Sequence, residues 1–278
     1  MADAGSPHLS FRLLTYNIND EAISESAPEG WSLATQQHRL CDLIRGLHPD
    51  LLCLQECFTF PHRLAGEYDI HGEALSHRGS CVVGTRRGGP LKAAGPAVSV
   101  GPCVLVPLLL EPAGLRLFAA SAHLAPFHEF GSVRAKQLAA IVAAAPPGEP
   151  LVVAGDLNMR EKESGLPPSL GLADAWVEAG SPPAERWSWD TRVNRYYTQG
   201  HAYTARYDRV LYRAGCLRVR GFGLAANQPC SSAGGESHFL SDHFAVTARL
   251  ELLPPPPPPP PPPAAAAETG LAAGRVGG

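Results

Sequence analysis

The sequence lacks the features that would place the chain in a membrane, in the secretory pathway, or on DNA as a coating protein. No apolar run approaches the roughly 20 residues needed to cross a bilayer, and residues 1–10 contain no apolar signal core. The formal net charge is -3, so there is no basic excess for non-specific DNA coating. We therefore expect an intracellular protein, in the nucleus or the cytoplasm or both, that does not enter a membrane.

Paired metal-binding cysteines are also lacking. The chain has seven cysteines, an odd number, at irregular spacing and with no Cys-x-x-Cys pair. This disfavours a zinc site. Several of the cysteines lie within apolar runs, which is typical of buried free thiols in a reducing compartment.

Positive charge is concentrated in one stretch. Residues 186–220 contain eight arginines against two aspartates. A solvated arginine surface and a track for backbone phosphates explain this stretch equally well.

The chain divides into a central domain and two tails. We expect a disordered tail at residues 1–8, a catalytic domain at 9–253, and a disordered Pro/Ala/Gly-rich tail at 254–278. The unbroken proline run at 254–263 favours polyproline II and cannot join a sheet. It is a candidate ligand for a proline-binding module, although a stiff spacer is the commoner role of such a run.

Apolar patterning predicts alternating strands and helices in the central domain. Helical spacing is found at residues 32–47 and 132–144. Strands are predicted at residues 11–18, 51–54, 80–85, 103–110, 115–122, 151–154, 207–212 and 244–250. This mixture predicts an α/β fold of two packed sheets with helices outside them.

Most of these strands have polar residues of similar chemistry at one end. They are Asn17, Glu56, His123, Asp156, Asn158, Asp208, Asp242 and His243. Strand ends meet at one edge of a sheet, where binding sites commonly form. Carboxylate and amide oxygens at such an edge suit Mg²⁺ and a phosphate group.

Six short motifs in this order resemble the endonuclease/exonuclease/phosphatase superfamily. They read TYNI, LQE, SAHL, GDLN, YDR and SDH and span roughly residues 10–252. Each motif alone is weak, but the ordered set is specific. The resemblance implies a deoxyribonuclease-like, four-layer α/β sandwich, in which helices flank two packed mixed β-sheets.

Three segments are most similar to the tyrosyl-DNA phosphodiesterase 2 subfamily. They are residues 159–161 after GDLN, residues 188–194 and residues 207–213. The resemblance implies hydrolysis of the phosphodiester that joins a tyrosine to a DNA 5′ end, with DNA ends carrying that adduct as the partner.

The resemblance and the chemistry together assign a metal and a water to the site. Glu56 is expected to hold Mg²⁺ or Mn²⁺, and Asp242 to contact the ion directly or through water. Asp156 would accept a proton from the attacking water, with Asn158 positioning water or phosphate. Asn17 would contact this cluster through its amide. Taken singly, Asn17 and Asp242 fit turn-capping residues better.

Two histidines are the expected donors to the phosphate. His123 and His243 would stabilise non-bridging oxygens in the transition state, and Asp208 would orient His243. Alone, His123 fits a hydrogen-bonded core histidine. We expect Arg134 and Gln137 to support the strand that ends at His123.

Arg160, Trp189 and Arg209 are the candidate substrate-binding residues. A guanidinium of Arg160 stacked on the Trp189 indole would fix a DNA-binding loop beside the site. The alternative is a core tryptophan and a surface arginine.

Other functions stay open. Within the superfamily, the chain could be a nuclease, a sphingomyelinase or an inositol-phosphate phosphatase, and outside catalysis it could be a scaffold. The Ala205-Arg206-Tyr207-Asp208-Arg209 sequence departs from inositol phosphatases, and the intact motif set counts against a scaffold. The exact phosphodiester, the choice between Mg²⁺ and Mn²⁺, and the oligomeric state are not readable from the sequence.

Overall fold

The computed structural model describes residues 9–111, 113–198, 200–230 and 238–253. Both tails that we expect to be disordered, including the proline run, lie outside the described residues. Within the described part, no helix has the length and apolar character to cross a membrane.

One sheet has six strands in the order β14-β15-β1-β2-β4-β3. Strands β1 and β2 run parallel, and the other neighbours are antiparallel. The strands are β1 (Ser10–Asn17), β2 (Leu51–Cys57), β3 (Tyr68–Leu75), β4 (Ser80–Arg86), β14 (Leu217–Ala225) and β15 (Ala245–Leu252).

The second sheet has seven strands in the order β10-β13-β9-β8-β7-β5, with β6 also pairing with β7. Strands β8 and β9 are parallel to each other. The strands are β5 (Leu91–Ala93), β6 (Val98–Ser99), β7 (Cys103–Leu110), β8 (Leu115–His123), β9 (Leu151–Asp156), β10 (Leu172–Asp174) and β13 (Asp208–Arg213). A separate two-stranded ribbon joins β11 (Trp189–Asp190) to β12 (Thr204–Ala205).

Two long helices and two short ones complete the fold. They are α1 (Leu33–Leu47), α2 (Gly131–Ala144), α3 (Leu166–Ser169) and α4 (Ala175–Glu178). Short 3-10 turns are found at Phe60–Leu64, His128–Phe130, Glu161–Glu163 and Pro183–Glu185. The side chain of Ser32 caps α1 by accepting from the Thr35 amide. Both helices and all eight strands predicted from apolar patterning are found, with bounds that differ by a few residues.

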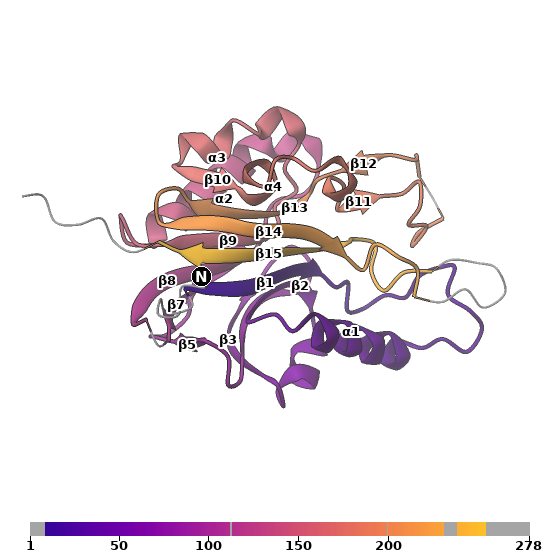
Figure 1. The fold of residues 1–278 in the computed structure, drawn as a ribbon. Helices are drawn as coiled ribbons and strands as arrows, with labels where there is room; N and C mark the ends of the chain where they lie inside the picture. The colour runs from indigo at the N-terminus through magenta and orange to yellow at the C-terminus, as the bar shows by residue number, and fades with distance from the viewer. Residues whose placement is uncertain (1–8, 112, 199, 231–237, 254–278) are drawn as a thin grey trace, which may run out of the picture.

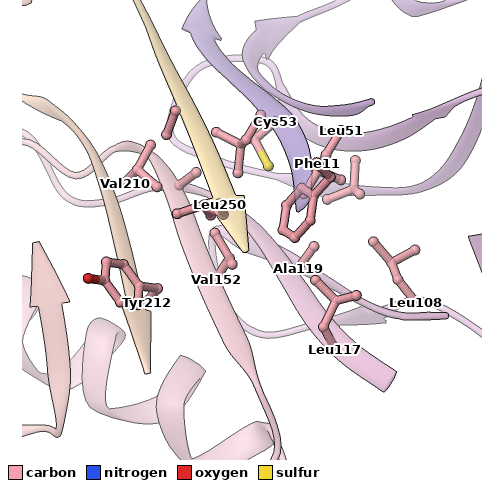
Figure 2. Packing of buried hydrophobic residues seen from close by; sticks show 14 of the residues in the cluster. Phe11, Leu51, Cys53, Leu108, Leu117, Ala119, Val152, Val210, Tyr212 and Leu250 are labelled. Carbon is pink, nitrogen blue, oxygen red and sulfur yellow. The ribbon is translucent and has the colours of Figure 1, made fainter. Parts of the chain in front are cut away.

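Three apolar cores separate four layers. The period-2 alternation of each strand sends neighbouring side chains to opposite cores: Leu13 packs between the sheets, whereas Leu14 packs under α1. On the second sheet, Val152 packs between the sheets and Val153 packs under α2. Figure 1 shows α1 on one side of the sandwich and α2, α3 and α4 on the other, and Figure 2 shows the core between the sheets. The predicted four-layer α/β sandwich is confirmed.

The strand ends that carry the polar motifs meet at one rim of the sandwich. In the second sheet Asp156 pairs directly with His123 on one side and with Asp208 on the other. In the first sheet, an irregular pairing between Leu54 and Cys57 and a positive φ of 51° at Glu56 turn that carboxylate out of the regular strand.

Gly155 is required by the close approach of β8 and β9. It has φ +152°, and a Cβ at this position would lie 1.9 Å from the Ala122 carbonyl oxygen. The backbone of β9 therefore places Asp156 only if residue 155 has no side chain.

We predict that Gly155→Ala destabilises the protein by about 3 kcal/mol or more, through backbone strain and the clash with Ala122. The measurement is the midpoint of urea unfolding. Gly165→Ala is the matched control, because its Cβ would meet no heavy atom of the described residues within 4 Å. Equal midpoints for the two variants would contradict the close approach.

Candidate active site

The amide of Asn17 joins the two sheets at the rim. Its Nδ2 donates to Glu56 Oε1 at 3.0 Å and to Asp156 Oδ2 at 3.2 Å. His243 Nε2 lies 3.5 Å from the same nitrogen. Asn17 is fully buried. Its side chain links Glu56 to Asp156 at the centre of the cluster, so it does not serve merely as a turn cap.

Asp156 is a buried carboxylate between two histidines. Its Oδ2 lies 3.3 Å from His123 Nε2 and 3.6 Å from His243 Nε2. Burial alone would raise the pKa of Asp156, but His243 and His123 outweigh it and hold that pKa well below its usual range. Asp156 is therefore ionised at neutral pH.

Asp208 holds the other side of His243. Its Oδ2 lies 2.8 Å from His243 Nδ1. Burial opposes the charged imidazole, yet Asp208 and Asp156 outweigh it and raise the pKa of His243 well above its usual value. Burial also raises the pKa of Asp208, against the effect of His243. Because the His243 ring contacts two carboxylates, we assign the shared proton to the ring and describe His243 as an imidazolium.

The turn after β9 fixes Asn158 beside this trio. Asn158 has φ 51°, its amide N–H donates to Asp156 Oδ1 at 3.0 Å, and its Nδ2 donates to the Leu124 carbonyl at 3.1 Å. The first bond fixes the Asn158 backbone, and the second holds its side-chain amide in one orientation at the rim.

Arg134 and Gln137 support the segment that follows His123, as the sequence predicts. Gln137 accepts from the Ala125 amide at 2.9 Å, and Arg134 donates to the Ala125 carbonyl at 2.8 Å. Arg134 is fully buried and pairs with Glu163 at 2.6 Å. These contacts fix the backbone after β8.

Two acidic groups form a second centre beside the first. Burial and then the negative charge of Asp242 raise the pKa of Glu56, and Asp242 Oδ1 accepts from Asn19 Nδ2 at 3.1 Å. Glu56 Oε2 is buried without an aligned hydrogen bond in the described part of the chain. Repelling carboxylates and a buried oxygen that accepts no aligned hydrogen bond fit a bound cation.

Another donor set lies close by. Asp156, Asp208 and His243 offer ligand atoms within 4.8 Å of one another, which is close enough to share an ion. A protonated His243 is a donor and cannot ligate a metal, so this set competes poorly with Glu56 for a cation.

Sequence reasoning missed the tip of the β3–β4 hairpin. His77 packs edge-on against His123 with ring centroids 4.0 Å apart, and Ser76 Oγ lies 3.4 Å from His123 Nδ1. Arg78 Nε lies 2.9 Å from Glu56 Oε2. Strand β3 was not predicted, so its turn could not be placed at the rim. Asn19 was also missed, although it lies two residues after Asn17.

The expected stacking of Arg160 on Trp189 is wrong. The Arg160 guanidinium lies over the Tyr207 ring at 4.4 Å from its centroid. Trp189 instead presents its ring edge-on to His243 at 4.8 Å. Trp189 therefore contacts His243, and Arg160 contacts Tyr207. The ring that the Arg160 guanidinium stacks on belongs to the residue that precedes Asp208 in the chain.

Arg209 lies in the interior, so the expected substrate contact is not available to it. Its side chain is 1% exposed and pairs with Asp174 at 3.2 Å. Burial and the neighbouring Arg206 lower the pKa of Arg209 to about 10.

Most other arginines of the basic stretch also have partners within the protein. Arg192 pairs with Asp190 at 2.6 Å, and Arg206 pairs with Asp174 at 2.6 Å. Arg218 pairs with Glu251 at 3.6 Å. The stretch therefore contributes less free positive charge than its composition indicates.

A family model matches residues 14–243, which include every strand end described above. That model is the Endonuclease/Exonuclease/phosphatase family. The chain belongs to this family.

Several tyrosyl-DNA phosphodiesterases are similar in sequence to this chain. The tyrosyl-DNA phosphodiesterase 2 of Xenopus laevis is 26% identical over 87% of this chain and 67% of its own length. The 5′-tyrosyl-DNA phosphodiesterase of Caenorhabditis briggsae is 31% identical over 49% of this chain. That alignment spans 39% of the nematode protein, and the alignment with the Caenorhabditis elegans enzyme spans 38%.

Solved structures share the fold. Danio rerio TDP2 complexed with a single-strand DNA product has a TM-score of 0.72 and is 19% identical, over 87% of this chain and 99% of that one. TDP2 from Caenorhabditis elegans has a TM-score of 0.70 and is 23% identical, over 89% of this chain and 78% of that one. The family fold is therefore preserved across nearly all of the described chain.

We predict that Asp208→Asn lowers the folded-state pKa of His243, because it removes one of the two carboxylates that favour the imidazolium. The raised pKa stabilises the folded protein fully below the unfolded-state value of about 6.5, and this stability is lost as pH rises through the folded-state pKa. In the variant the loss should begin at the same pH but be complete at a lower pH, because only the folded-state pKa changes. Histidine ring resonances in NMR, followed against pH, measure the shift.

Asp69→Asn is the control, because Asp69 forms an exposed pair with Arg87 far from the rim. If the His243 resonances titrate alike in wild type and Asp208→Asn, the assignment of the charged pair is incorrect.

Proposed function

We propose that this protein is a metal-dependent phosphodiesterase that hydrolyses the bond between a tyrosine and a DNA 5′ end, as part of DNA repair. The observation that carries the proposal is the buried cluster of Asp156, His243 and Asn17 beside the oxygen-rich Glu56 centre. The names of its relatives supply the substrate class, since a Xenopus laevis relative aligned over 87% of this chain is a tyrosyl-DNA phosphodiesterase.

Water attack follows from the charges at the rim. Asp156 is kept ionised by its histidines, so it accepts a hydrogen bond from the attacking water and then its proton. Its low pKa makes it a weak base while both histidines contact it. When the histidines turn to phosphoryl oxygens, its proton affinity rises, which couples proton transfer to attack.

His243 and His123 are the donors to the non-bridging oxygens, which carry the negative charge that develops in the transition state. The imidazolium of His243 is held by Asp208, so its other nitrogen stays directed at the rim at little reorganisation cost. Asn17 holds Glu56 and Asp156 in place on the same side through its two N–H groups. The reaction needs no covalent enzyme intermediate, because Asp156 activates water directly.

We propose Glu56 as the ligand of a divalent ion, with Asp242 contacting the ion directly or through water. The buried Oε2 of Glu56, which accepts no aligned hydrogen bond in the described residues, and the oxygen-only donor set suit Mg²⁺ or Mn²⁺. When bound, the ion supplies positive charge that polarises a phosphoryl oxygen and offsets the charge of the leaving tyrosinate.

An aromatic pocket next to Asn158 supports DNA as the substrate. It has a volume of about 420 Å³ and its lining includes Arg160, Trp187, Tyr203 and Tyr207. Aromatic rings stack on bases and a guanidinium offsets phosphate charge, a combination used for single-stranded nucleic acid. We propose that the first nucleotides of the DNA strand lie here, beside Trp189.

The test of function is turnover of a single-stranded oligonucleotide bearing a 5′-phosphotyrosine, with Mg²⁺. Wild type should release tyrosine and a 5′-phosphate end, and Glu56→Gln should reduce kcat by about 100-fold or more. Glu67→Gln, at an exposed carboxylate paired with Arg45, should be fully active. If the protein cleaves a generic phosphodiester with metal but releases no tyrosine from DNA, the proposed active site stands and the proposed substrate is wrong.

The nucleotide pocket makes a separate prediction. Tyr203→Ala should raise KM for the oligonucleotide by about 5- to 150-fold, from a stacking contribution of about 1–3 kcal/mol per base, and leave turnover of p-nitrophenyl thymidine 5′-phosphate nearly unchanged in kcat. Tyr203→Phe retains the ring and should behave as wild type. Tyr203 is 45% exposed, so loss of folding is not expected. An unchanged KM in Tyr203→Ala would place the strand elsewhere.

A further inference from the structure

The turn at the tip of the β3–β4 hairpin aims an arginine at the proposed metal carboxylate. The Ser76 amide donates to the Gly79 carbonyl at 3.0 Å, and Ser76 Oγ donates to the Arg78 carbonyl at 2.6 Å. Gly79 has φ +58°, a conformation that favours glycine. The backbone of the turn is therefore closed by its own bonds, and the Arg78 side chain extends from it to Glu56.

Arg78 joins both acidic groups of the centre. Its Nε lies 2.9 Å from Glu56 Oε2, and its Nη2 donates to Asn19 Oδ1 at 2.8 Å. Asn19 in turn donates to Asp242 at 3.1 Å and to the Tyr197 hydroxyl at 2.8 Å. One guanidinium thus balances Glu56 directly and is coupled to Asp242 through a neutral amide.

The contact with Glu56 is close but poorly directed. Glu56 Oε1 already accepts a hydrogen bond from Asn17, so Oε2, the oxygen that Arg78 faces, is the freer ligand atom for a cation. At 2.9 Å the Arg78 N–H is not aligned with Oε2, which has no aligned hydrogen bond in the described residues. A guanidinium and a divalent ion cannot both lie against this one oxygen, because the two positive charges repel at such short range.

We propose that Arg78 is an internal competitor for the metal: its guanidinium neutralises Glu56 until a divalent cation displaces it, and it thereby lowers metal affinity. The side chain of Arg78 is 39% exposed, so it has solvent in which to move. Its four-bond stem lets the charge swing away while the hairpin backbone stays closed. Occupancy of the centre then follows the concentration of free metal.

This inference rests on the proposed function only in the assignment of the metal to Glu56. The opposite role is that Arg78 orients Glu56 for the metal, in which case its loss weakens binding. Metal affinity separates the two roles without any substrate.

The experiment is calorimetric titration of Mn²⁺, and then Mg²⁺, into the full chain after treatment with a chelator. Arg78→Gln keeps a polar side chain, shorter than arginine and without charge, and it should bind Mn²⁺ about tenfold more tightly. Without metal, the variant should unfold at a lower temperature than wild type, because Glu56 loses its counter-charge. With saturating Mn²⁺ the two midpoints should coincide.

Arg87→Gln is the matched control, since Arg87 lies just after β4 and pairs with exposed Asp69. It should change neither affinity nor midpoint. The gain in affinity should also vanish when Arg78→Gln is combined with Glu56→Gln, because the competition acts on that carboxylate.

Equal or weaker Mn²⁺ binding by Arg78→Gln overturns the competition. Tighter binding that persists in the double variant overturns the assignment of Glu56 as the contested ligand. Failure to hydrolyse tyrosyl-DNA leaves the calorimetric result standing, so the two proposals fail separately.

Discussion

The rim of the sandwich depends on one electrostatic constraint, which is the burial of the ionised Asp156. A carboxylate that is 2% exposed is stable only with opposite charge and hydrogen bonds close to it. Those partners come from both sheets, with His123 from one and Asn17 and His243 from the other. The carboxylate that we propose as the activator of water therefore also holds the two sheets together at this edge.

The backbone meets this constraint with local departures from regular structure. The irregular pairing at Glu56, the positive φ of Asn158 and the missing side chain at Gly155 all lie within a few residues of the cluster. Such conformations are costly unless the surrounding fold determines them. The three apolar cores supply that rigidity, because the central strands β2 and β9 are buried along their whole length.

Patterns within short segments were readable from the sequence, whereas contacts between distant segments were not. Leu51–Cys57 is fully buried, so its apolar run and its terminal Glu56 could be predicted together. Strand β3 is half-buried along most of its length, and β14 contains Gly221 and Gly223 at an irregular pairing. Neither strand has a clear apolar period, so neither was predicted. Because β3 was missed, Arg78 in the turn that follows it was missed as well.

Side-chain partners show the same limit. Motif spacing placed Arg160 near the turn after β9. Whether its guanidinium stacks on Tyr207 or on Trp189 depends on how the segment before β13 packs. Arg209 follows the catalytic Asp208 directly, yet strand alternation sends it to the opposite face, toward Asp174. Proximity in sequence to a catalytic residue was therefore a poor guide to function at that position.

The charges at the rim bear on how a protein with a net charge of -3 would bind DNA, the substrate we propose. Four carboxylates lie there, at Glu56, Asp156, Asp208 and Asp242, and they would repel a phosphate if they were unbalanced. Since most arginines of residues 186–220 are paired within the protein, attraction must come from single cations placed around the cluster. His243, Arg78 and Arg160 lie on different sides of it. This arrangement favours one phosphate at one position over a long DNA track, which suits an enzyme that acts on the end of a strand.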